Sequence, residues 1–172
     1  MKGHIRIAKL LYRSLGSPQP PDDALAGPAY TLDVAGTEFL FEIGARAVDP
    51  VGGQRSAPVD VVLETDSRKP DAKHRILELY VENGLALPDT PVMALHRGRI
   101  DLLEELLVDY PSLLNRRFTH NEIYPPELGC HDEVLATQGT PLAGTTLLHL
   151  CVDYDEFEIA EWLIARGADV NA

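Results

Sequence analysis

Side chains that could do chemistry gather in the C-terminal half of the sequence. Cys130 and His131 are adjacent and two acids follow them, while His149 and Cys151 lie further along. Thiolate, imidazole and carboxylate groups bind zinc, but no pair here has the Cys-x-x-Cys or His-x(3)-His spacing that turns two ligands towards one ion. No oxyanion-hole or nucleophile-elbow motif accompanies the cysteine. The sequence therefore predicts no enzyme and no cofactor, and leaves Cys130 and His131 only as candidate metal ligands.

The elements that must position these residues contain an internal repeat. Segments 76–86, 102–112 and 159–169 each carry apolar residues at helical spacing, and their apolar columns align. Two of the copies share a glycine column, represented by Gly167 in the last copy, and glycine is typical of a helix C-terminus. The middle copy instead reaches Pro111, which also stops a helix. Each copy is predicted to be a helix with a defined end.

A second, shorter helix is expected in front of each copy. Ser56 is a candidate N-cap with Pro58 near the start of the helix, and Asp89 is a candidate N-cap with Pro91 in the first turn. The last copy is preceded by "TTLLHLCVDYDEFE", residues 145–158. Each unit is thus predicted to be a helical hairpin, and Pro58 and Pro91 lie 33 residues apart.

The last copy resembles an ankyrin repeat over its whole length. In "TTLLHLCVDYDEFEIAEWLIARGADVNA", Thr146, Leu148, His149 and the closing "GADVNA" fall on motif positions, and the 33-residue spacing agrees with the family period. Leu147 stands where the motif has a proline. The resemblance implies a mainly α fold, an ankyrin-repeat helical solenoid, that binds another protein and catalyses nothing. In this family "GADVNA" leads into a further repeat, so we expect a truncated C-terminus whose uncapped repeat either frays or buries its open surface by self-association.

The resemblance also implies how the chain is organised. We expect an N-terminal capping segment, 1–55, two divergent repeats, 56–117, an insertion loop, 118–143, and a final repeat, 144–172. Within the capping segment we expect an N-terminal helix and a Pro- and Gly-rich linker. Residues 30–43 then alternate apolar and polar side chains around "AG", which favours a β-hairpin. A degenerate helical repeat is the alternative.

Four residues of the last repeat are predicted to be structural. Thr146 is expected to cap a helix, and the resemblance implies that His149 hydrogen-bonds within the turn. Trp162 lies in the apolar stripe and is expected to pack in the core, while Gly167 ends the helix.

The insertion is the candidate partner-binding segment. It contains four acids and no lysine or arginine, and long loops in compact domains are usually functional or disordered. Tyr124 is predicted to anchor a partner, because tyrosine dominates many interfaces. Pro125 and Pro126 would stiffen the loop, and Glu122 and Glu127 favour a basic patch on the partner. One alternative is that the loop packs over the groove between the second and third repeats, and another is that it binds a metal ion or small molecule.

Charge and composition limit the partners further. The net charge is −12, and residues 56–172 hold 21 acids against nine bases, a balance that argues against nucleic acid as a partner. No apolar run approaches the roughly 20 residues of a membrane helix, so no membrane is expected. Two cysteines give no disulfide framework, which favours a cytoplasmic protein.

Overall fold

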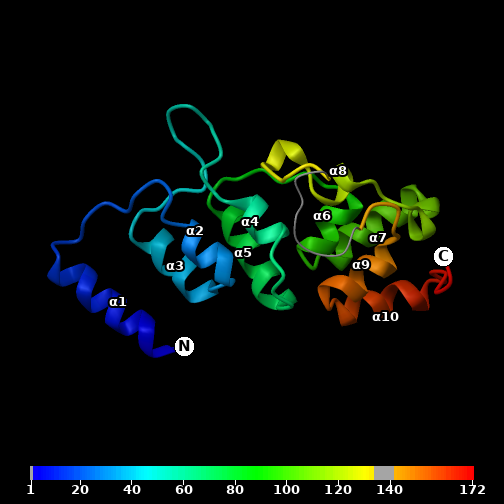
Figure 1. The fold of residues 1–172 in the computed structure, drawn as a ribbon, viewed down its shortest axis with the longest axis horizontal. Coiled ribbons are helices and arrows are strands. Elements are labelled where there is room, and N and C mark those ends of the chain that lie inside the picture. Colours follow the sequence, from blue (N-terminus) through cyan, green and yellow to red (C-terminus); the bar gives the residue numbers. More distant parts are fainter. Residues whose placement is uncertain (1, 134–141) are drawn as a thin grey trace.

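The computed structural model describes residues 2–133 and 142–172, and this part of the chain is mainly helical (Figure 1). It contains no β-strand. Its elements, in chain order, are α1 (Lys2–Ser14), α2 (Ala26–Thr31), α3 (Val34–Glu42), α4 (Val59–Leu63), α5 (Pro70–Glu82), α6 (Pro91–His96), α7 (Ile100–Asp109), η1 (Pro111–Asn115), α8 (His120–Ile123), η2 (Pro126–Leu128), α9 (Leu147–Tyr154) and α10 (Phe157–Ala165).

Most of the helices pack as pairs that follow one another along the chain. The pairs are α2 with α3, α4 with α5, α6 with α7, and α9 with α10. The first two pairs contact each other through α2 and α4 and through α3 and α5, and α6 contacts both α5 and α9. Figure 1 shows α1 at one end of the longest axis, followed by α2 with α3 and then α4 with α5, while α9 and α10 lie below α6 and α7 at the other end. Residues far apart in sequence therefore meet mainly where neighbouring pairs touch.

The β-hairpin predicted for residues 30–43 is wrong, because α2 and α3 occupy this segment. The carboxylate of Asp33 accepts a hydrogen bond from the Gly36 amide at 3.2 Å and caps α3. A Cβ at position 36 would lie 2.7 Å from Asp33 Oδ2, so the glycine leaves room for this cap. Leu32 makes the turn between the helices with a φ of +51°. The "AG" pair thus belongs to a helix start and not to a strand turn.

The helix starts before the second and third pairs also differ in detail from the prediction. α6 is capped by Thr90, whose Oγ1 accepts a hydrogen bond from the Met93 amide at 3.2 Å, so Asp89 is not the cap. The residue before α4 is Pro58, and no side chain caps this helix, so Ser56 is not a cap either. At α6 the cap is the residue next to the predicted one, and at α4 the predicted side-chain cap is absent.

Apolar side chains form two core clusters. The first lies among α2 to α5 and the second among α6 to α10. Fully buried members of the first include Leu25, Val62, Leu63, Ile76, Leu77 and Tyr80, and those of the second include Leu95, Leu103, Ile123, Leu147, Leu150 and Leu163. Tyr124, from the predicted insertion, packs against both clusters. The boundary between the clusters is therefore where the insertion meets the rest of the molecule.

Candidate functional site

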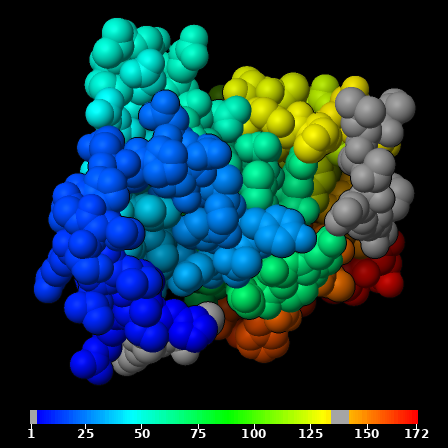
Figure 2. Space-filling model, turned by 60° about the vertical axis from the view of Figure 1, so that its left-hand side comes forward, coloured from blue at the N-terminus to red at the C-terminus, as the bar shows by residue number. Residues whose placement is uncertain are grey.

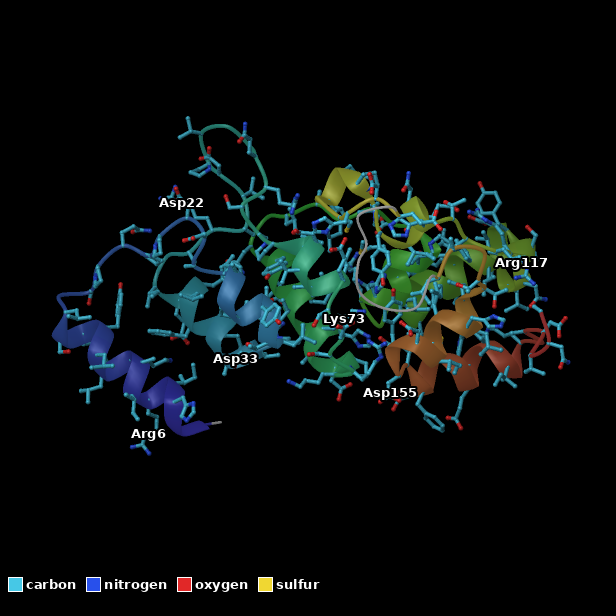
Figure 3. The ribbon with its side chains drawn as sticks, in the orientation of Figure 1. Arg6, Asp22, Asp33, Lys73, Arg117 and Asp155 are labelled. Carbon is cyan, nitrogen blue, oxygen red and sulfur yellow. The ribbon has the colours of Figure 1, made fainter. Side chains whose placement is uncertain are left out.

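The predicted insertion leaves the helical pairs and returns to them at one place. The Phe118 amide donates a hydrogen bond to the Thr145 carbonyl at 2.9 Å, and the Gly144 amide donates to the Phe118 carbonyl at 2.7 Å. The Arg117 guanidinium, labelled in Figure 3, also donates to the Gly144 carbonyl at 2.7 Å. These bonds close the base of the segment. Residues 134–141 lie outside the described part of the chain, so the site is built from what precedes them.

The first turn of the insertion is stabilised locally. The Thr119 amide and hydroxyl each donate a hydrogen bond to Glu122 Oε2 at 2.8 Å, at the start of α8. Glu122 also pairs with Arg116. A carboxylate near a helix N-terminus is favourable because unpaired amides point towards it. Glu122, predicted to face a partner, is therefore already engaged within the chain.

Tyr124 lies in the boundary between the two core clusters. Its hydroxyl accepts a hydrogen bond from the Tyr154 hydroxyl at 2.7 Å, and its ring centroid lies 5.3 Å from that of His120 and 6.5 Å from that of His96. Pro125, next in the chain, is buried. These contacts support the alternative in which the insertion packs over the groove between helical pairs. Tyr124 and Pro125 as partner-binding residues remain predictions.

The end of the described insertion is fastened to α4. The His131 amide donates to Glu64 Oε1 at 2.6 Å, and the His131 ring lies 2.7 Å from Glu64 Oε2 through Nδ1. The hydrogen bond that the His131 ring donates to this carboxylate raises the pKa of His131. The His120 ring in turn donates to the His131 carbonyl at 2.9 Å. The Glu64 bonds thus fasten this end of the segment beside α4, and the His120 bond connects the two ends of the segment.

The exposed part of the segment forms an outer edge, which we define as Pro126, Glu127, His131, Asp132 and Glu133. Figure 2 shows the segment in yellow along the upper side of the molecule, open to solvent. The edge is acidic, since acids on neighbouring elements add to its own. Burial raises the pKa of the nearby Cys130 thiol to about 12, and the negative charges of Glu64, Asp60 and Glu127 contribute to the shift. Acidic side chains at α4 and on the insertion therefore lie close to one another around Cys130.

A buried polar cluster lies beneath the insertion, in the boundary between the cores. Lys73 on α5 is 3% exposed, and its Nζ donates to His96 Nδ1 at 3.0 Å. The same Nζ lies 3.8 Å from the centre of the Tyr154 ring. His96 Nε2 donates to the Ile123 carbonyl at 3.3 Å. Figure 3 places Lys73 at the middle of the molecule. The cluster thus links α5, α6, α9 and the insertion.

Burial determines the protonation of this cluster. It lowers the pKa of Lys73 to about 7, against an opposing effect from the negative charge of Glu156. Burial also lowers the pKa of His96 well below its usual value, and the charge of Lys73 adds to that shift. The imidazole is therefore neutral near pH 7 and can accept from Lys73. If Lys73 and His96 were both protonated, two buried positive charges would lie 3.0 Å apart.

The candidate metal ligands do not come together. Cys130 is buried in the first core cluster with its pKa raised, whereas His131 is exposed and bonded to Glu64. Within the described residues, no three His, Cys, Asp or Glu side chains are arranged to hold a metal ion. Cys151 is buried too, and burial raises its pKa to about 12, so both thiols are protonated near neutral pH. The geometry gives no support to a thiolate site.

The four residues singled out in the last repeat lie as follows. Thr146 is at the N-cap position just before α9, but its hydroxyl is joined to His149 Nδ1 at 2.9 Å and no side-chain bond caps the backbone. Trp162 packs against the second core cluster, with the Arg166 guanidinium 3.8 Å from its ring centre. Gly167 has a φ of +89°. The Thr146–His149 bond closes the first turn of α9, so it fixes how α9 begins.

Comparison with known proteins gives one match, and it falls on these same residues. A family model for the ankyrin repeat matches residues 143–172. The match covers one repeat, so this segment is similar to a single ankyrin repeat. A search of the curated proteins and a search of the solved structures found no match. The ankyrin repeat thus comprises α9, α10 and the turns on either side of them. In the described part of the chain, no helix is long and apolar enough to cross a membrane.

Sequence reasoning missed the buried cluster beside the ankyrin repeat. Lys73 occupies the same helical stripe as Ile76, Leu77 and Tyr80, all of which are fully buried. A lysine at i, followed by apolar residues at i+3, i+4 and i+7, signals a charge on the core face of a helix. That signal was available in the sequence. Its partners, His96 and Tyr154, could not be identified, because they come from two other helices.

Proposed function

We propose that this chain is a non-catalytic interaction module that binds another protein through the outer edge of its insertion. An ankyrin repeat suggests a protein–protein interaction module, and α9 of that repeat holds Tyr124 through Tyr154. The observation that carries the proposal is the edge itself. It is exposed and acidic, and it follows directly from a segment fastened to both core clusters.

Preorganisation is the physical reason that this edge suits binding. A loop that is already held in place loses little conformational entropy when a partner docks. The hydrogen bonds of His131 to Glu64, and of His120 to His131, hold the backbone next to Glu127 and Glu133. The acids then favour a partner with a basic patch, and the association should weaken as salt rises.

The proposal alters the set of residues expected to touch the partner. Pro126 and Glu127 are exposed and remain in it, and Asp132 and Glu133 join them. Glu122, Tyr124 and Pro125 are assigned to holding the segment in place. The metal- or small-molecule-binding alternative has no observation in its favour.

The test is affinity capture with matched charge variants. The double variant Glu127→Lys/Glu133→Lys removes acids from the outer edge. The control Glu105→Lys/Glu161→Lys makes the same change in net charge at exposed acids on α7 and α10. Proteins retained by the wild type and by the control, but lost by the outer-edge variant, support the proposal. A set of captured proteins that is the same for both variants contradicts it.

A further inference from the structure

The N-terminal helix α1 presents a second surface, separate from the insertion. Its half-buried residues are Ile5, Ala8, Lys9 and Tyr12, which recur at helical spacing and form one face. Tyr12 meets the Phe39 ring edge-on with centroids 5.9 Å apart, and Lys9 pairs with Glu42 at 2.6 Å. These contacts hold that face of α1 against α3 and leave the opposite face outside.

The outer face of α1 is apolar. Ile7, Leu10, Leu11 and Leu15 are between 54% and 73% exposed, and the first three follow the i, i+3, i+4 pattern of a single helical stripe. Single exposed apolar residues are common, but a stripe opposite a packed face needs a cause. In Figure 2 this helix, in dark blue, lies at the lower edge of the molecule.

A basic stripe runs beside the apolar one. Four bases and no acid occur in α1, whereas the rest of the chain holds 27 acids and 11 bases. Arg6 and Arg13 line a surface hollow together with Ile7, Lys9 and Leu10. Within residues 2–133 and 142–172, neither Arg6 nor Arg13 has an ion-pair partner. Figure 3 shows Arg6 pointing away from the body of the protein.

We propose that α1 docks this protein on an anionic lipid surface, with Ile7, Leu10 and Leu11 in the headgroup boundary and Arg6 and Arg13 on the lipid phosphates and carboxylates. An amphipathic helix whose apolar residues are confined to a stripe, with basic residues beside it, lies in the plane of a membrane interface. Attraction to anionic lipids adds to the apolar contribution, and each basic residue near the surface strengthens it.

Shape decides between a lipid surface and a protein groove. A groove that accepts an amphipathic helix surrounds most of it, and here Tyr12 and Lys9 keep one side of α1 on α3. A bilayer touches one side of a helix only, which is the side that α1 exposes. The helix also lies at one end of the elongated molecule (Figure 1), so most of the acidic body extends further than a Debye length of about 8 Å from the surface.

The experiment is co-sedimentation of the full chain with phosphatidylcholine vesicles, with and without one quarter phosphatidylserine. We expect binding to the mixed vesicles, little binding to phosphatidylcholine alone, and release at high salt. Arg6→Gln/Arg13→Gln should bind the mixed vesicles about 25-fold more weakly, from roughly fivefold for each basic residue. Ile7→Asn/Leu10→Gln should lose most of the binding, because it removes the apolar stripe.

The matched control is Arg46→Gln/Val51→Asn, which removes an exposed base and a 94% exposed apolar residue from another surface. This variant should bind mixed vesicles as the wild type does. All variants should melt within a few degrees of the wild type, because the altered side chains are exposed. The proposal is overturned if the wild type does not bind the mixed vesicles or binds both vesicle types equally. It is also overturned if Arg6→Gln/Arg13→Gln binds the mixed vesicles as tightly as the wild type. If the protein does not bind vesicles, the exposed stripe of α1 would instead be a contact surface for an acidic protein.

Discussion

The inner face and the outer edge of the insertion belong to one short segment and differ in what surrounds them. The inner face, with Ile123, Tyr124, Leu128 and Cys130, is packed against the two cores. The outer edge, with Glu127 and Glu133, faces solvent. The difference shows that one short segment can pack against two cores on one side and present acidic side chains to solvent on the other. Its apolar residues extend the core, and this fixes the position of the exposed polar residues, through which we propose that a partner binds.

The largest loss of stability is expected for a substitution at the inner face. Tyr124→Ala removes a ring that contacts both cores and the acceptor of the Tyr154 hydroxyl, so the free energy of unfolding should fall by about 3 kcal/mol. Tyr124→Phe is the control, since it keeps the ring and should cost about 1 kcal/mol. Urea denaturation measures both. A loss below about 1 kcal/mol for the alanine variant would mean that the inner face is not part of the core.

The next effect concerns the cluster beneath the inner face. The pKa of Lys73 is about 7 in the folded protein and about 10.5 when unfolded, so the unfolded chain binds more protons between these values. Stability should therefore rise with pH across this window, by about 2 kcal/mol between pH 7.5 and 9.5. Lys73→Met should remove that rise. The stability of Lys73→Met relative to the wild type, measured by urea denaturation at pH 7.5 and at pH 9.5, should fall as the pH increases.

A difference in stability that does not change with pH between the wild type and Lys73→Met would contradict this account. Lys69→Met on the exposed surface is the matched control, and its difference from the wild type should stay constant over the same window. Both variants lose one amine. If the difference in stability from the wild type changes with pH only for Lys73→Met, the change comes from the burial of Lys73.

A smaller effect is expected where the two faces meet. Gly129 has a φ of +87°, and a Cβ there would lie 2.5 Å from Arg55 Nη2. Gly129→Ala should cost about 1–2 kcal/mol, because the alanine is strained and the guanidinium must move. Gly144 has a similar φ of +82° with open space around it, so Gly144→Ala measures the strain alone. Thermal unfolding should rank Gly129→Ala as the more damaging change, and the reverse order would exclude the Arg55 contact.

The smallest effect on stability is expected at the outer edge. Glu127→Lys/Glu133→Lys should change the free energy of unfolding by less than about 0.5 kcal/mol, because both side chains are exposed. Any loss of binding by this variant could then not come from unfolding. If the variant were as unstable as Tyr124→Ala, the separation of an inner face from an outer edge would fail.

The sequence allowed the last repeat to be predicted and the insertion only in part. Residues 143–172 follow a family pattern with local spacings, and a helix and its cap depend on neighbours within a few positions. The position of Tyr124 depends on Tyr154 and His96, which are 30 and 28 residues away, so no local pattern could reveal it. The N-terminal hairpin was mispredicted because the apparent alternation of Tyr30, Leu32 and Val34 runs across the end of α2, the turn at Leu32 and the start of α3, and so belongs to no single element.

Hydrogen exchange of the native protein tests the central claim most directly, because it needs no substitution. The Tyr124 amide donates to the His120 carbonyl at 2.7 Å, and the Leu128 amide donates to the Pro125 carbonyl at 2.9 Å. If the inner face is part of the core, these amides should open together with α9 and exchange as slowly as the Leu150 amide. Exchange of the Tyr124 and Leu128 amides at the rate of an unstructured peptide, with Leu150 still protected, would contradict the account.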